Sequence, residues 1–132
     1  MKSLIALLAA STIASTAFAA NAIEKLPSGV VVEHIKQGTG PQPAASDVVQ
    51  VNYRGTLANG TEFDNSAKHG GPATFPLGQV IPCWTQGLQK MKVGGKAKLT
   101  CPAATAYGSR AVGPIPPNSD LTFEVELIRI GQ

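Results

Sequence analysis

The chain has 132 residues and a formal net charge of +3, with 43% hydrophobic and 5% aromatic residues. This length accommodates a single domain, and the hydrophobic fraction excludes an intrinsically disordered chain. The net charge is too small to indicate nucleic-acid binding. All 14 Gly and 10 Pro follow residue 19, and this abundance disfavours a helical bundle and favours short strands joined by turns.

The first 19 residues are organised like a secretory signal peptide. Lys2 supplies the positive charge, residues 4–14 supply the apolar stretch, and Ala17-Phe18-Ala19 supply small residues before a cleavage site. We expect cleavage after Ala19 and a periplasmic or secreted bacterial protein. No later apolar run reaches the ~18 residues of a membrane-spanning helix, so we expect no membrane span. Residues 20–28 are short and polar and predict a loose arm before a domain over 29–132.

Six segments after residue 28 are typical of β-strands, because β-branched or aromatic residues are concentrated in them or alternate with polar residues. In chain order they cover residues 29–36, 48–54, 62–64, 73–77, 96–101 and 121–130. The second shows the pattern clearly, with Val49, Val51 and Tyr53 on one face. Asn59-Gly60 predicts a type I′ turn into the third segment. It also begins an Asn-Gly-Thr glycosylation sequon, but a turn is the simpler interpretation.

One helix is predicted between the fourth and fifth strands. Trp84, Leu88 and Met91 are spaced i, i+4 and i+7, which places them on one apolar face, and Gly94-Gly95 would end the helix. The next strand, residues 96–101, alternates in a way that would place its small and apolar residues against that helix. The predicted fold class is therefore α+β, with an antiparallel sheet of five or six strands packed on one short helix.

The two cysteines of an exported chain are most simply explained as one disulfide, Cys83–Cys101. Cys101 would point toward the helix start, where Cys83 lies, so the bond is sterically reasonable. A metal site lacks ligands at suitable spacing, because the only histidines are His34 and His69. A catalytic thiol paired with His69 is a weaker alternative.

Common catalytic motifs are missing from the sequence. It has no Gly-x-Ser-x-Gly elbow, no phosphate-binding Gly-rich loop ending in Lys-Ser/Thr, no Gly-x-Gly-x-x-Gly after a strand and no His-Glu-x-x-His. We therefore expect no metal or other cofactor. Lys90, Lys92, Lys96 and Lys98 form a basic cluster without interleaved aromatic residues, which indicates a solvated face more than a nucleic-acid or lipid site.

A series of aromatic and small residues remains, running through most of the chain after Gly29. Its segments are Val51-Asn52-Tyr53-Arg54-Gly55, Gly60-Thr61-Glu62-Phe63-Asp64-Asn65-Ser66, Leu77-Gly78-Gln79-Val80-Ile81-Pro82-Cys83-Trp84, Gly87-Leu88, Met91, Val93-Gly94, Ala106-Tyr107-Gly108, Ile115-Pro116-Pro117-Asn118 and Leu121-Thr122-Phe123-Glu124-Val125-Glu126-Leu127. This series closely resembles the FKBP-type peptidyl-prolyl cis-trans isomerases, in particular their small exported bacterial members.

The resemblance implies a sheet wrapped around the helix, with the substrate proline bound in a pocket between them. Asp64 and Tyr107 would be the polar catalytic groups at the rim. The substrate-binding positions would be Trp84 as the floor, Tyr53, Phe63, Val80, Ile81 and Phe123 as walls, and Ile115 on the flap loop. In the family, the backbone N–H at the Ile81 position and the Tyr107 hydroxyl bind the carbonyl groups of the ligand. The expected partners are proline-containing polypeptides and the macrolide inhibitors tacrolimus and rapamycin, and the expected state is a monomer.

Three departures from the family pattern affect the pocket. Ala73 stands where many members have a wall Phe, although Phe75 could compensate. The flap between Tyr107 and Ile115 is shorter by one residue than in small eukaryotic members, with Pro114 at an apolar position. The Arg that often partners the rim carboxylate is absent, so the partner of Asp64 would be Lys68 or His69 instead. A proline-binding module without turnover and a disulfide-stapled module without a ligand are the rival hypotheses.

Overall fold

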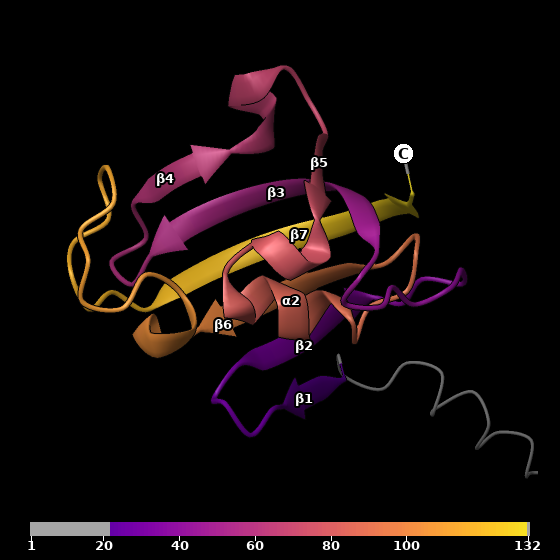
Figure 1. Ribbon diagram of the computed structural model, residues 1–132, viewed down its shortest axis with the longest axis horizontal. Helices are drawn as coiled ribbons and strands as arrows, with labels where there is room; N and C mark the ends of the chain where they lie inside the picture. The colour runs from indigo at the N-terminus through magenta and orange to yellow at the C-terminus, as the bar shows by residue number, and fades with distance from the viewer. Residues whose placement is uncertain (1–21, 132) are drawn as a thin grey trace, which may run out of the picture.

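The computed structural model describes residues 22–131 as one curved antiparallel sheet bent around one short helix (Figure 1). The strands are β1 (Ile23–Lys25), β2 (Val31–Lys36), β3 (Val48–Leu57), β4 (Glu62–Asn65), β5 (Ala73–Pro76), β6 (Lys96–Cys101) and β7 (Leu121–Ile130), and the helix is α2 (Pro82–Leu88). Their order across the sheet is β1-β2-β6-β7-β3-β4, and β5 also pairs with β3. The predicted α+β architecture is confirmed, and the predicted signal peptide, residues 1–19, lies outside the described residues.

The alternation in the sequence determines which face of the sheet is buried. In β6, Ala97, Leu99 and Cys101 are fully buried, while the residues between them are exposed. Strand β7 continues the same inner face, because Leu99 lies opposite Phe123 in the register. The interior beneath the sheet is filled mainly by Val and Leu side chains, and α2 packs against this face.

The outer face of the sheet carries the charges. Lys96 lies opposite Glu126 and Lys98 lies opposite Glu124 in the β6–β7 register. Opposite charges on neighbouring strands stabilise a solvated sheet face, so half of the basic cluster noted in the sequence faces acidic neighbours.

The helix is shorter than its apolar spacing predicts. It ends at Leu88, and Lys90 and Met91 continue as tight turns, donating backbone hydrogen bonds to Gly87 (3.0 Å) and Leu88 (3.0 Å). Met91 is nevertheless buried. The prediction that Gly94-Gly95 ends the helix is therefore wrong, because successive turns bury a residue at i+7 as a continued helix would.

A strand replaces the predicted loose arm. Residues Ile23–Lys25 form β1, which pairs with β2 and raises the strand number to seven. A short contact reinforces this pairing, since Glu24 Oε2 lies 2.6 Å from Nε2 of the buried His34. Strand β1 was missed because three residues show no usable periodicity; backbone pairing and one polar contact specify it.

The β3–β4 turn is not type I′. Gly60 has a φ of +90°, but Asn59 is not in the positive-φ region that a type I′ turn requires of both central residues. Instead, Gly60 N–H donates to Leu57 C=O (2.9 Å) and Leu57 N–H donates to Thr61 C=O (2.8 Å). A tight turn followed by a left-handed glycine therefore makes the hairpin.

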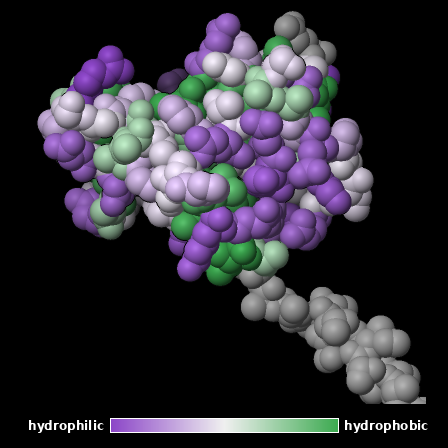
Figure 2. Space-filling view, turned by 60° about the horizontal axis from the view of Figure 1, so that its bottom comes forward, coloured by the Kyte–Doolittle hydropathy of each residue, from purple (hydrophilic) through white to green (hydrophobic). Residues whose placement is uncertain are grey.

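Within residues 22–131, the large hydrophobic side chains that remain exposed are Ile23 and Ile35, on β1 and β2. Figure 2 brings this edge of the sheet forward and shows hydrophilic side chains over most of the face, with small apolar areas between them. No helix in this part of the chain is long and apolar enough to cross a membrane.

The predicted disulfide is confirmed. Cys83 at the start of α2 is bonded to Cys101 at the end of β6, and both residues are fully buried. The bond closes a loop with a sequence separation of 18 and attaches the helix to the sheet one residue before Trp84. The alternative of a catalytic thiol is excluded, since neither of the two sulfurs is free.

Reduction of this disulfide should destabilise the native protein. In the chain-entropy model a loop of this size contributes roughly 3 kcal/mol to the free energy of unfolding. Urea unfolding of the oxidised and the reduced wild-type protein measures the difference without any mutation. Equal midpoints for the two forms, or reactive thiols in the denatured, unreduced protein, would contradict this prediction.

Candidate functional site

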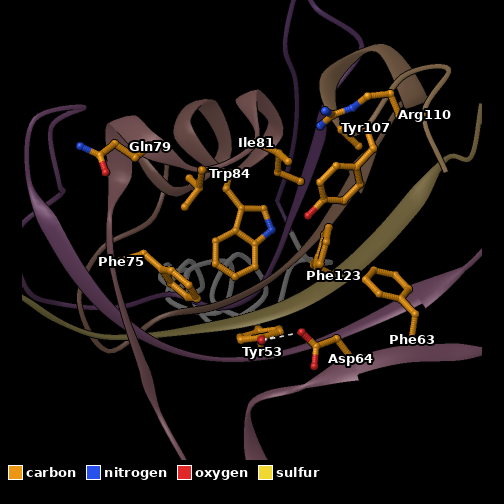
Figure 3. A pocket seen from close by; sticks show the side chains of 12 residues that line it. Tyr53, Phe63, Asp64, Phe75, Gln79, Ile81, Trp84, Tyr107, Arg110 and Phe123 are labelled. Carbon is orange, nitrogen blue, oxygen red and sulfur yellow. Dashed lines mark hydrogen bonds between the residues drawn. The ribbon is translucent and has the colours of Figure 1, made fainter. Parts of the chain in front are cut away.

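A pocket of about 480 Å³ opens between α2, the inner face of the sheet and the loop that follows β6 (Figure 3). This volume lies in the usual range for small-molecule and side-chain binding sites. Its lining residues are Tyr53, Phe63, Asp64, Phe75, Gln79, Val80, Ile81, Trp84, Ala106, Tyr107, Arg110 and Phe123. All six aromatic residues after the predicted signal peptide are among them, so the small aromatic content of the chain is concentrated at one site.

Trp84 is the centre of the aromatic cluster. Its side chain is 5% exposed and projects from α2 toward the sheet. The rings of Tyr53, Phe75 and Phe123 surround it edge to face, with centroid distances of 5.3, 5.5 and 5.3 Å and interplanar angles of 75°, 87° and 85°. Such pairs add about 0.5–1.5 kcal/mol each beyond area burial, so three strands hold the indole in place.

The Trp84 Nε1–H is buried without a hydrogen-bond partner among the described residues. In Figure 3 the indole nitrogen lies on the side of the ring that faces Phe123. A buried donor without a partner costs about 1–3 kcal/mol. The indole therefore occupies a position where shape and apolar contact outweigh hydrogen bonding, and the floor of the pocket carries no charge.

The wall formed by Phe63 of β4 and Phe123 of β7 depends on Gly55 of β3. A Cβ at this position would lie 2.5 Å from Phe63 Cζ and 2.9 Å from Phe123 Cε1. Without it, Phe63 and Phe123 pack edge to face with centroids 5.5 Å apart. Gly55 therefore permits two wall rings to lie directly on the strand.

Asp64 is held by three hydrogen bonds at the pocket rim. Its Oδ2 accepts from the Tyr53 hydroxyl (2.7 Å), and its Oδ1 accepts from the Asn65 backbone N–H (2.8 Å) and lies 2.8 Å from His69 Nε2. His69 therefore occupies the partner position for which the sequence left Lys68 and His69 as alternatives. Lys68 instead contacts Glu62 at 3.4 Å.

The local sequence after β4 brings His69 back to Asp64. Asn65 caps the short helical turn of residues 66–69, with its side chain accepting from Ala67 N–H at 2.9 Å. The buried Ser66 hydroxyl accepts from Tyr53 N–H at 3.1 Å, which attaches this turn to β3. Gly70 then leaves the turn at a φ of +95°, a conformation that favours glycine.

These contacts shift the pKa values of the two acidic groups in opposite directions. Partial burial acts to raise the pKa of Asp64, but the hydrogen bonds from Tyr53, His69 and Asn65 outweigh it and lower the pKa below its usual value. Burial, followed by the hydrogen bond to Asp64, raises the pKa of Tyr53 well above its usual value. At neutral pH Asp64 is therefore an ionised acceptor and Tyr53 a neutral donor.

The loop between β6 and β7 supplies the opposite rim. Tyr107 and Arg110 lie above the pocket, and the Tyr107 hydroxyl points into it (Figure 3). Gly108 and Asn118 close the base of this loop through a 2.7 Å backbone hydrogen bond. Val112 and Ile115 form a small bridge at its tip.

The structure brings all but one of the sequence-predicted site residues to this pocket. The exception is Ile115, which is 5% exposed and belongs to the hydrophobic core. Phe75 lines the pocket, as the sequence suggested for a chain with Ala73. Sequence reasoning missed Gln79, Ala106 and Arg110. The first two flank predicted residues, whereas no pattern distinguishes Arg110 from other surface cations.

Residues 22–131 contain no group of three or more His, Cys, Asp or Glu side chains that could hold a metal ion. The polar groups available at the pocket are one carboxylate, two phenols, an amide, an indole N–H and a guanidinium. This set can bind and orient carbonyl groups around an apolar ring.

The described residues thus form a seven-stranded antiparallel sheet bent around one helix, with a ring-lined pocket between them. The chain belongs to the FKBP-type peptidyl-prolyl cis-trans isomerase family, whose model matches residues 40–128. It is 50% identical over 108 residues to the FKBP-type isomerase FkpA of Aeromonas hydrophila, which covers 82% of this chain and 40% of that protein. It is also 50% identical over 106 residues to the outer membrane protein MIP of Legionella longbeachae, covering 80% and 46% of the two chains.

Solved structures agree with this assignment. FkpA from Escherichia coli superposes with a TM-score of 0.80 at 43% identity, covering 92% of this chain and 57% of that chain. A peptidyl-prolyl isomerase from Pseudomonas syringae pv. tomato superposes with a TM-score of 0.78 at 36% identity, covering 98% and 100%. The chain spans about two-fifths of the length of the first curated relatives it matches.

The Asp64 network should contribute to stability in a pH-dependent way. A carboxyl group whose pKa is lower in the folded state stabilises that state above its unfolded pKa of about 3.9 and loses the effect as pH falls through the folded pKa. Asp64→Asn should therefore destabilise the protein at neutral pH, and its difference from wild type should shrink in acid. Urea unfolding of both proteins between about pH 7 and 2 measures this, with Asp47→Asn, away from the pocket, as the control. A difference in the free energy of unfolding between wild type and Asp64→Asn that grows as the pH falls would contradict the prediction.

Proposed function

We propose that this chain catalyses cis-trans rotation about X-Pro bonds in proline-containing polypeptides. The observation that supports it most directly is the pocket floor: Trp84 is held edge to face by three rings beneath a cavity of about 480 Å³, which is large enough for a proline ring. Family membership supports the same reaction.

This reaction needs no proton transfer, nucleophile or cofactor. The barrier, about 18–20 kcal/mol, arises because the amide loses its resonance when it twists. Water solvates the polar planar amide better than the less polar twisted amide. A dry aromatic pocket reverses this preference, so binding energy is greater in the twisted transition state than in the ground state.

The polar groups at the rim would hold the substrate while it twists. The Ile81 C=O accepts from Trp84 and Thr85 N–H at the start of α2 (2.9 and 3.2 Å), which fixes the Ile81–Pro82 peptide unit, next along the chain from the unit that carries the Ile81 N–H. We infer that the Ile81 N–H and the Tyr107 hydroxyl bind carbonyl groups flanking the proline. Asp64 orients Tyr53 by accepting a hydrogen bond from its hydroxyl at the pocket rim.

We further propose that the protein is an exported monomer that binds tacrolimus and rapamycin in this pocket. The signal-like residues 1–19 support export, although they lie outside the described residues, and the name of the Legionella relative points to the cell envelope. Mass spectrometry of the protein from its native host tests the cleavage after Ala19, and native mass spectrometry tests the monomer.

Exchange spectroscopy by NMR on a short X-Pro peptide tests the catalytic proposal. Wild-type protein at a small fraction of the peptide concentration should accelerate exchange. Trp84→Leu should reduce kcat/KM by about tenfold, equivalent to about 1.4 kcal/mol of lost transition-state contact. Leu26→Ala, on a separate groove, serves as a control for general destabilisation. Binding of the peptide without any acceleration of exchange, even at stoichiometric protein, would contradict the catalytic proposal and support the rival hypothesis of a proline-binding module.

A further inference from the structure

Arg110 is the cationic side chain at the pocket. Of the lining residues, Tyr53, Asp64, Tyr107 and Arg110 are titratable, and Arg110 carries the positive charge among them. In Figure 3 its guanidinium lies above Tyr107 and Ile81, on the side of the pocket opposite Asp64. Within residues 22–131, no carboxylate lies within 4.0 Å of it.

The two charged groups at the rim, Asp64 and Arg110, differ in how many hydrogen bonds they make within the protein. Asp64 already engages a phenol, a backbone N–H and an imidazole. Arg110 is exposed, and among the described residues its hydrogen bond is that of its backbone N–H to Tyr107 C=O (3.1 Å). A bound polypeptide therefore meets a carboxylate whose oxygens are already hydrogen-bonded on one side and an available guanidinium on the other.

The loop that carries Arg110 is anchored at both ends of its turn. The bond from Arg110 N–H to Tyr107 C=O places the two residues on one turn, so the backbone of Arg110 is fixed close to that of Tyr107, whose hydroxyl points into the pocket. Further along, Val112 and Ile115 exchange backbone hydrogen bonds of 3.0 and 2.8 Å, and the buried Ile115 fixes the loop to the core. Arg110 is thus held near the pocket mouth by the loop itself.

We propose that Arg110 is a specificity-determining residue that selects substrates with an acidic side chain adjacent to the proline. A guanidinium presents several N–H donors in a planar fork and binds carboxylates in a bidentate manner. With the proline ring on Trp84, the neighbouring residues of the substrate leave the pocket over its rim, where Arg110 lies. This inference rests on the proposed isomerase function.

Matched peptides test the inference. Two series carry Glu, Gln or Lys immediately before or immediately after the proline, and kcat/KM is measured by NMR exchange at low ionic strength. At a partly exposed ion pair we expect wild type to favour Glu over Gln by about two- to fivefold in at least one series. Arg110→Gln should bring this ratio to about one, and Arg110→Glu should reverse the preference toward Lys. High salt should reduce the wild-type ratio because the charges are screened.

The controls distinguish the role of Arg110 in substrate choice from the isomerase function itself. Lys98→Gln removes the same charge from the outer face of β6 and should leave the Glu/Gln ratio at its wild-type value. Because Arg110 is exposed, the urea unfolding midpoint of Arg110→Gln should be close to that of wild type, which shows that the variant folds. A wild-type ratio of one in both series, or a ratio unchanged by Arg110→Gln, overturns the role of Arg110 while isomerisation stands. Failure to accelerate any of the peptides overturns the isomerase function itself.

Discussion

The edge-to-face packing of Trp84 is the interaction on which the site depends. The indole comes from a helix of only seven residues, which is too short to be stable on its own. Pro82 begins this helix, Cys83 bonds it to β6, and Thr85 Oγ1 donates to Leu77 C=O at 2.7 Å. These contacts let a short helix present one large side chain at a fixed place beneath the sheet.

The curvature of the sheet makes this packing possible. Rings from β3, β5 and β7 must reach one indole from different sides, and a flat sheet would separate them. Small residues make room at the crowded points. Gly55 lies beneath the Phe63–Phe123 pair, and a Cβ on Gly87 of the helix would lie 3.0 Å from Leu99 Cδ2. At Gly55 and Gly87 the space left for the side chain, more than its polarity, determines which residue fits.

The electrostatics of the rim fit a reaction that moves no proton. The hydrogen bonds to Asp64 keep its pKa low, and burial with the Asp64 contact keeps the Tyr53 pKa high. The pKa values of Asp64 and Tyr53 are therefore both shifted away from neutral pH, whereas a general acid or base needs a pKa close to it. Both are suited to holding a fixed arrangement of dipoles around a twisting amide. Arg110 adds an unpaired charge to this arrangement, which bears on substrate choice more than on the chemical step.

The sequence predicts the parts of the fold that depend on side-chain alternation. Strands such as β6 and β7 could be predicted because their buried faces follow a period of two. Strand β1, the end of the helix and the form of the β3–β4 turn could not, because backbone hydrogen bonds decide them. Most of the pocket followed from the family resemblance. Ile115 and Arg110 lie on one loop, and only its folded path shows which of them faces the core and which the pocket.

The position of the substrate proline tests the account most directly. Intermolecular NOEs can be measured between the proline ring protons of a bound X-Pro peptide and the indole protons of Trp84, the only tryptophan in the chain. The account predicts NOEs from the proline ring to the indole and upfield shifts of those proline protons. Peptide binding that produces NOEs elsewhere on the protein and none to Trp84 would contradict it.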